Sequence, residues 1–206
     1  MKKILYTIIL SFLFSSSVFA NYQAGEDAYM KGDYATALKE YRAAAEQGDA
    51  RGQSALGYLY MMGKGVLQDY EEAVKWFRLA AEQGDARGQN NLGMSYAMGQ
   101  GVLQDYEEAV KWFRLAVAQG DAMAQYNLAL CYGQGLGVDY DLVAAYMWFN
   151  ISTVSGLKAD QKIPSEQIKQ FKEKRDIAAN HMTSEQIAKA QKLARECVEK
   201  NYKDCG

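Results

Sequence analysis

The chain has 206 residues, a formal net charge of −2 and 49% hydrophobic residues, so it is long enough to bury a core of its own. It has neither a strongly basic balance nor basic runs, and we therefore expect no nucleic-acid partner. Only one Pro is present, which favours helix through most of the chain.

Residues 1–20 have the pattern of a secretory signal peptide. Lys2 and Lys3 precede an apolar run at 4–14, and compact residues lead to Ala20. Because the run is shorter than the ~20 residues of a membrane span, cleavage before Asn21 is favoured over an uncleaved anchor. We predict an exported protein, periplasmic or fully secreted, with no membrane insertion after cleavage.

A fixed period organises the next part of the chain. Residues 49–84 and 85–120 are identical at 28 of 36 positions. The same step separates further landmark residues, which are Gly48, Gly84, Gly120 and Gly156, and also Trp76, Trp112 and Trp148. A period of this length indicates stacked helical units, each too small to bury its apolar face alone.

Each full unit predicts two helices. Helix A, at 50–62, follows Asp49 as N-cap and ends at Gly63, a residue suited to the left-handed conformation after a helix. Helix B, at 70–83, begins with a capping box at Asp69–Glu72.

The two ends of the chain differ from this pattern. The opening pair, 22–32 and 33–48, lacks the Gly-x-Gly connection of the later units. After residue 156 the repeat stops, and 165–181 and 184–200 predict two further helices. Thr183 and Gln186 form a capping box for the second of these. We expect this tail to cover the open end of the repeats.

The repeat motifs resemble those of the Sel-1-like repeat family, relatives of the tetratricopeptide repeats. The motifs that carry the resemblance are Leu56-Gly57, Gly63-Lys64-Gly65-Val66, Asp69-Tyr70, Trp76-Phe77 and Ala80-Ala81-Glu82-Gln83-Gly84, with their later copies. The resemblance implies an all-α, right-handed superhelical solenoid with helix A on the concave side and helix B on the convex side. It places four units at 21–48, 49–84, 85–120 and 121–156, followed by a helical cap at 157–206. The family supplies interaction scaffolds rather than one chemistry.

Candidate catalytic residues have simpler structural explanations. The lone His181 cannot make a multi-histidine metal site, and recurring pairs such as Glu71-Glu72 suit the first turn of a helix. The Gly-x-Gly triplets follow no strand, so helix termination is favoured over phosphate binding. One Trp per unit at an apolar helical position indicates core packing rather than sugar stacking. We predict no catalytic residue, no metal site and no cofactor.

The three cysteines have separate roles. We predict a disulfide between Cys197 and Cys205 at the chain end, because disulfides persist in the compartments that exported proteins reach. Cys131 is expected to be a small buried hydrophobe. Some secreted Sel-1-like proteins carry paired cysteines in every repeat, and β-lactam binding or hydrolysis has been attributed to them. This chain lacks those pairs, which argues against the same activity.

The differences between the two near-identical units indicate a binding surface. Eight positions differ, and six of them lie within or just after helix A. We predict that a protein or peptide binds the concave helix A face through an apolar strip, formed by Tyr58, Met62, Met94, Met98, Tyr126 and Leu130. The alternative is that these residues pack helix A against the next unit.

The sequence therefore predicts a non-enzymatic, monomeric interaction scaffold of the cell envelope or outside the cell. Two alternatives stay open: an enzyme acting on β-lactams or cell-wall material, and a secreted effector acting on a host protein.

Overall fold

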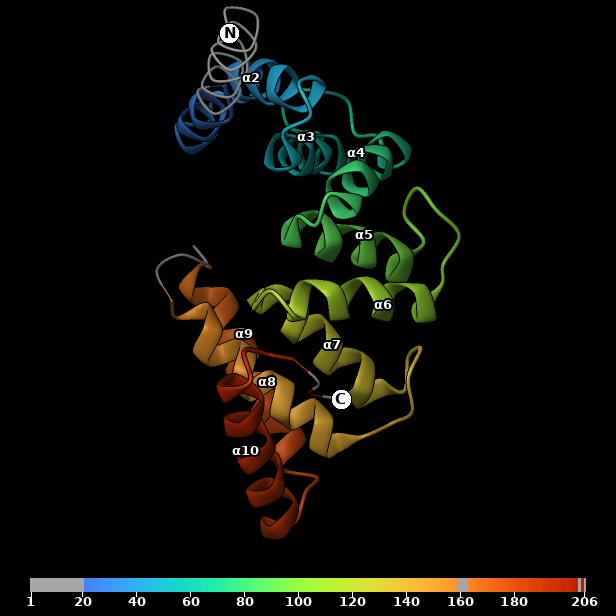
Figure 1. Cartoon of the computed structure of the whole chain (residues 1–206), viewed down its shortest axis with the longest axis vertical. Coiled ribbons are helices and arrows are strands. Elements are labelled where there is room, and N and C mark those ends of the chain that lie inside the picture. Colours follow the sequence, from blue (N-terminus) through green and yellow to red (C-terminus); the bar gives the residue numbers. More distant parts are fainter. Residues whose placement is uncertain (1–20, 159–162, 204, 206) are drawn as a thin grey trace, which may run out of the picture. The chain divides into compact units, whose positions relative to one another are not determined.

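The computed structural model describes residues 21–158, 163–203 and 205, so the predicted signal peptide lies outside the described residues. All regular structure in these ranges is α-helical (Figure 1), which confirms the all-α fold class. Residues 21–30 are helical and precede the first turn. The remaining helices are α2 (Tyr34–Glu46), α3 (Ala50–Met62), α4 (Tyr70–Glu82), α5 (Ala86–Met98), α6 (Tyr106–Val117), α7 (Ala122–Gln134), α8 (Leu142–Gly156), α9 (Ser165–Ala179) and α10 (Ser184–Glu199).

The helix boundaries follow the predicted signals closely. Helix α3 has the predicted bounds, with the Asp49 side chain accepting from the amides of its first turn and Gly63 left-handed at φ 64°. The carboxylate of Asp69 likewise accepts from the amide of Glu72, at 2.9 Å. The chain divides into two compact units. The division along the chain falls within α5, between Asn91 and Leu92.

In the first unit, the core lies between the opening helix, α2 and α3. Its buried residues are Ala28, Ala37, Tyr41, Ala45, Leu56 and Leu59. Close packing requires glycine on the first helix of the first pairs: a Cβ on Gly57 would lie 2.7 Å from Phe77, and one on Gly25 would lie 2.5 Å from Tyr41. The last pair has Ala129 at the equivalent position. The opening pair therefore repeats the packing of the later pairs, although it lacks their longer connection.

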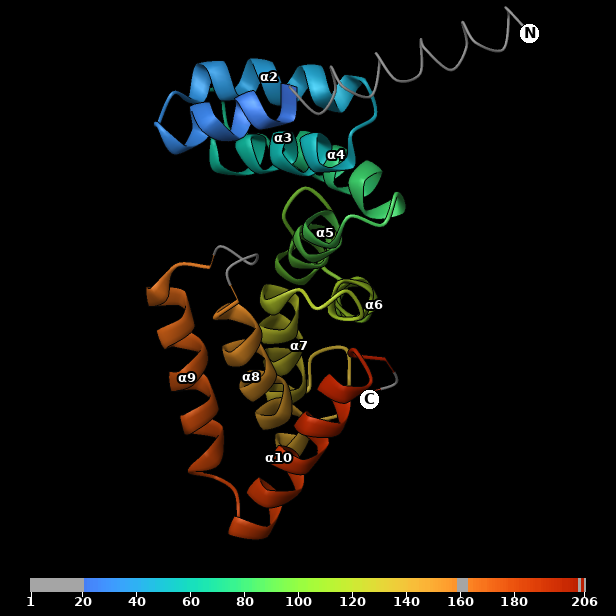
Figure 2. The same cartoon turned by 60° about the vertical axis from the view of Figure 1, so that its left-hand side comes forward.

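In the second unit, helix α8 lies at the centre. It packs against α7, α9 and α10, and Figure 2 shows α9 and α10 beside it. Trp148, Ile151, Ser152 and Ser155 on α8 are each at most 2% exposed. This burial explains why the repeat pattern changes after Phe149: the residues that follow pack against the C-terminal helices instead of another repeat.

The tryptophan row is only partly in the core. Trp148 is 1% exposed, whereas Trp76 and Trp112 are half-buried. The indole Nε1 of Trp76 donates to the Glu72 carboxylate at 3.0 Å, so this carboxylate faces the indole and Lys75. The predicted capping box at Asp69–Glu72 is therefore only half formed, because the Asp69 amide donates to the Tyr60 carbonyl instead of to Glu72. The capping box at Thr183 and Gln186 has both of its hydrogen bonds, at 3.2 and 2.8 Å.

Within the described ranges, none of the helices combines the length and apolar character needed to cross a bilayer.

Candidate partner-binding site

The structure places the six predicted strip residues on three helices: Tyr58 and Met62 on α3, Met94 and Met98 on α5, and Tyr126 and Leu130 on α7. Only the two methionines at helix ends are well exposed, Met62 at 47% and Met98 at 57%. The other four side chains are half-buried. Tyr58 and Met62 belong to the first unit and the other four to the second.

Tyr58 belongs to an aromatic cluster in the first unit. Its ring meets the ring of Tyr29 edge-on, with centroids 6.3 Å apart, and Tyr29 also contacts Tyr34 at 5.4 Å. The ammonium of Lys64 lies over all three rings, at 4.6 Å from the centroid of Tyr29, 4.9 Å from Tyr34 and 5.8 Å from Tyr58. These distances are those of cation–π contacts. We call these four residues the Lys64 cluster.

The cluster holds Lys64 in its charged form. Its Nζ donates to the hydroxyl of Tyr29 at 2.6 Å. This hydrogen bond, which outweighs the opposing effect of burial, raises the pKa of Lys64. Burial, followed by the neighbouring Tyr29, raises the pKa of Tyr58. Lys64 therefore carries a full positive charge at neutral pH, and the phenol of Tyr58 beside it remains protonated.

Tyr126 is engaged within the chain. Its ring stacks on Phe171 of α9 with centroids 4.6 Å apart, and it contacts Phe149 of α8 at 5.5 Å. These contacts match the packing alternative at this position, because two helices of the second unit already cover the ring. The neighbouring Leu130, one helical turn further along α7, is half-buried.

A polar depression lies elsewhere in the second unit. Its volume is about 660 Å³, and it is lined by Glu107, Arg114, Tyr132, Gly135, Gly137, Val138 and Asp139. Arg114 donates to the hydroxyl of Tyr132 at 2.9 Å, and Arg42 makes the same contact with Tyr60 at 2.8 Å in the first unit. This recurrence indicates that the arginine–tyrosine contact is part of the repeat framework.

The remaining polar candidates have structural roles. In the part of the chain that the structure describes, no three His, Cys, Asp or Glu side chains gather as metal ligands would. His181 is exposed in the turn before α10. Cys131 is buried as predicted, and burial raises the pKa of its thiol to about 11, so little reactive thiolate is present at neutral pH.

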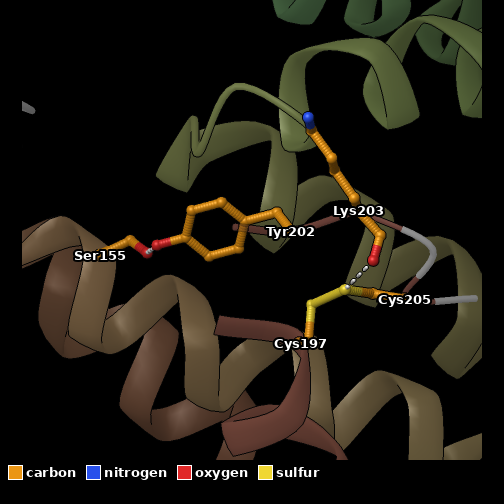
Figure 3. Close-up of a disulfide and its surroundings, with 5 residues drawn as sticks. All are labelled: Ser155, Cys197, Tyr202, Lys203 and Cys205. Carbon is orange, nitrogen blue, oxygen red and sulfur yellow. Dashed lines mark hydrogen bonds between the residues drawn. A yellow bond between two sulfur atoms is a disulfide. The ribbon is translucent and has the colours of Figure 1, made fainter. Parts of the chain in front are cut away.

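Cys197 and Cys205 form the expected disulfide, with Cα atoms 5.3 Å apart (Figure 3). The bridge closes a loop that holds Tyr202 in place. The amide of Tyr202 donates to the Cys197 carbonyl, and its hydroxyl lies 3.3 Å from that of Ser155. Its ring sits where a Cβ on Gly120 would be only 2.9 Å away. The loop thus attaches the chain end to the last repeat.

The sequence pattern predicted only Tyr58 of the four residues in the Lys64 cluster. Tyr29 and Tyr34 lie in the opening pair of helices. The repeat motif is defined by the later repeats, so it does not predict which residues of the opening pair contact α3. A signal for Lys64 was nevertheless present: Lys64/Gln100 and Tyr58/Met94 are two of the eight differences between the near-identical units. The lysine and the tyrosine that it contacts are present together in one copy and absent together in the next.

The helix pairs, their glycine contacts and their period define a class of α-helical repeat protein. The Sel1 repeat model matches residues 18–49, 50–85, 86–121 and 122–152, and the chain belongs to this family. Membership indicates a protein-interaction scaffold.

Solved structures agree with this assignment. The chain is 32% identical to a Sel1 repeat protein from Oxalobacter formigenes, with a TM-score of 0.62 and coverage of 77% of this chain and 70% of that one. It is 29% identical to a protective antigen of uropathogenic Escherichia coli that displays an SLR fold, with a TM-score of 0.57. That match covers 94% of this chain and 49% of the antigen, so the chain spans about half of its length. A comparison with curated proteins found no match.

Proposed function

We propose that this Sel1 repeat protein is an exported, non-enzymatic scaffold that binds a protein or peptide segment on the exposed face of α3. The observation that carries the proposal is the distribution of differences between two near-identical units. Helix B is conserved between the copies except at its last turn, whereas helix A and the residue after Gly63 change. Two repeats with the same structural framework are expected to differ at the positions that contact a ligand.

The chemistry of this face suits a protein segment. Tyr58 supplies an amphipathic ring, and Met62 a flexible apolar side chain that is 47% exposed. In the second unit, Met98 at 57% exposure offers a separate contact point, with Met94 half-buried on the same helix. Tyr126 is assigned to packing within the second unit, because its ring is already stacked on Phe171. Leu130, which is half-buried on the same helix, is not counted as part of the binding face.

Export is supported by two independent features. Residues 1–20 carry the charged start, apolar run and compact end of a signal peptide. The disulfide between Cys197 and Cys205 is a kind of bond that persists in oxidising compartments. We propose the periplasm or the exterior of the cell as the site of action.

The proposal is tested by photocrosslinking in the producing cells. A photoreactive amino acid replaces Met62, and in a control protein it replaces Leu79 on α4, which is similarly exposed at 45%. We expect position 62 to yield a discrete protein adduct that is absent at position 79. The adduct should also disappear when Tyr58→Met is combined with the position 62 probe. Equal crosslinking at 62 and 79 would contradict a specific α3 surface.

A non-enzymatic scaffold should not hydrolyse β-lactams. We expect no turnover of nitrocefin by the purified protein. Turnover that a single substitution removes would overturn this part of the proposal.

A further inference from the structure

Among the residues that the structure describes, Lys64 is a charged group without a carboxylate partner. Lys75 and Lys111 form ion pairs with Glu72 and Glu108, at 3.0 and 2.9 Å. The ammonium of Lys64, in contrast, contacts only the hydroxyl of Tyr29 and the three tyrosine rings among the described residues. Its charge is thus held in a fixed position but is not neutralised by an anion.

The hydrogen-bonding capacity of the cluster is mainly that of a donor. A lysine ammonium has three N–H donors and no acceptor, and Tyr29 uses one of them. The Tyr29 hydroxyl is also hydrogen-bonded to Tyr58, so the remaining donors of the cluster are the other N–H groups of Lys64. A positive charge with N–H donors left over is complementary to an oxyanion, and charge-assisted hydrogen bonds of this kind are short and strong.

The surroundings of the cluster favour one source of that oxyanion. The ammonium lies among three tyrosine rings, which are apolar surfaces. A single cation among such rings suits one carboxylate flanked by apolar groups. A phosphate group, with roughly two negative charges, would be better matched by several cations or an Arg fork.

We propose that Lys64, positioned by Tyr29, Tyr34 and Tyr58, binds one carboxylate of an acidic side chain in an otherwise apolar partner segment. This inference rests on the proposed function, because it names the chemical group of the partner that the α3 surface binds. The tyrosines act as positioning residues: their rings and the Tyr29 hydroxyl fix the ammonium.

The two near-identical units supply variants that the fold already accepts. Lys64→Gln introduces the residue found at the equivalent position of the repeat at 85–120, which is Gln100. Tyr58→Met likewise introduces the equivalent of Met94. Both variants are therefore expected to keep the fold, which circular dichroism and thermal melting verify. Lys75, which already has a carboxylate partner, provides the internal control lysine.

The first measurement is an NMR titration of the purified protein with acetate, inorganic phosphate and tetramethylammonium. We expect acetate to shift the Lys64 ammonium and Tyr29 ring signals saturably, with a Kd of ~10–100 mM. Lys75 should show no saturable shift. Tyr58→Met should weaken the acetate response severalfold, and Lys64→Gln should remove it from Tyr29.

Three outcomes would overturn the inference. The first is the absence of a saturable acetate response at Lys64, or an equal response at Lys75. The second is phosphate binding at least ~10-fold tighter than acetate, which would assign the site to a phosphorylated group. The third is saturable binding of tetramethylammonium to the tyrosine rings, which would make the cluster a cation site.

A second measurement separates this inference from the proposed function. The affinity of the partner identified by crosslinking is compared for the wild-type protein and Lys64→Gln, at low and high salt. We expect a loss of ~10-fold or more at low salt that shrinks as salt screens the charge. An unchanged affinity rejects carboxylate recognition by Lys64 and leaves the scaffold function intact. If no partner binds the wild type, the scaffold proposal fails, whereas the acetate titration still decides the chemistry of the cluster.

Discussion

At the scale of single residues, sequence-equivalent positions have different environments. Trp76, Trp112 and Trp148 occupy the same place in successive units, yet only Trp148 is fully buried. The reason is that α8 is covered by α9 and α10 as well as by α7. Helical periodicity therefore predicted which face these residues share, but could not predict how many neighbours cover that face.

This difference should appear in stability. We expect Trp148→Ala to lower the free energy of unfolding by ~3–5 kcal/mol, because a large buried side chain leaves a cavity. Trp76→Ala should cost clearly less, since its ring is already partly in contact with water and its Nε1 bonds the partly exposed carboxylate of Glu72. Thermal and urea unfolding measure both. Similar losses for the two variants would mean that burial of the indole does not control its contribution.

Two capping aspartates at equivalent positions also have different environments, and their pKa values shift in opposite directions. Burial acts against the charge of Asp49, but the hydrogen bonds and charge of Arg51 outweigh it, so the pKa of Asp49 is lowered. Asp85 occupies the equivalent position in the next repeat. There burial has the largest effect and raises the pKa of the carboxyl group. A lowered pKa stabilises the fold above pH ~4, and this stability is lost as pH falls through the folded-state pKa. A raised pKa means that ionisation weakens the fold as pH rises through the same region.

The two aspartates should therefore respond differently to neutralisation. Asn also caps helices well, so each Asp→Asn change mainly removes charge. At pH 7 we expect Asp49→Asn to destabilise by ~0.5–1 kcal/mol, and Asp85→Asn to be neutral or stabilising. The effect of Asp49→Asn should fade as pH falls through the lowered pKa of Asp49, because the wild-type carboxylate is then also protonated. Unfolding curves from pH 7 down to about pH 2 test this, and an equal loss at both positions at pH 7 would contradict it.

At the scale of helices, the sequence predicted nearly every boundary. The N-cap aspartates, the glycine that ends α3 and the capping box of α10 all lie where the pattern placed them. Such signals are local, so they can be read without knowledge of the fold. Contacts between distant helices were less accessible. The stacking of Tyr126 on Phe171 joins α7 to α9 and depends on how the tail folds back, which no repeat pattern encodes.

The contact between α7 and α9 gives a specific test. Phe171 is 1% exposed, and Phe171→Ala should cost ~3–5 kcal/mol and free the ring of Tyr126. Ile177→Ala on the same helix is the matched control, because Ile177 is 54% exposed and should lose less than ~1 kcal/mol. Chemical denaturation compares the variants, and NMR follows the Tyr126 ring. A stable Phe171→Ala protein with an unchanged Tyr126 signal would remove α9 from the core.

At the scale of the whole molecule, the chain end is attached by chemistry as well as by packing. The disulfide encloses Tyr202, which receives a hydrogen bond from Lys158 at 3.1 Å. Because the closed loop is short, the chain-entropy model gives ~2–3 kcal/mol of stabilisation. Sequence analysis found this bridge because the two cysteines are close together at the end of a predicted helix. It could not find the contact of Tyr202 with Gly120, which lies far away in the sequence.

Reduction should therefore loosen the tail first. In a Cys131→Ala background, reductant should lower the melting temperature and increase amide exchange around Tyr202 and the end of α8. Cys197→Ser combined with Cys205→Ser should give the same result without reductant. Mass spectrometry of alkylated, unreduced protein is the direct check. Modification of both Cys197 and Cys205 under those conditions would show that the bridge is absent.

The burial of α8 also restricts how such a protein can change length. Ser152 and Ser155 on α8 are at most 1% exposed, and α8 packs against α9 and α10 rather than another repeat, so the last repeat is covered. A duplicated segment inserted between Gly84 and Asp85 would meet the same neighbours as the copies beside it. The same segment inserted after residue 156 would separate α8 from its cover and expose polar and apolar residues selected for burial. We expect the first insertion to give a soluble, cooperatively melting protein and the second an aggregating one. Gene duplication in this lineage would then lengthen the molecule from within, while its carboxyl end stays the same.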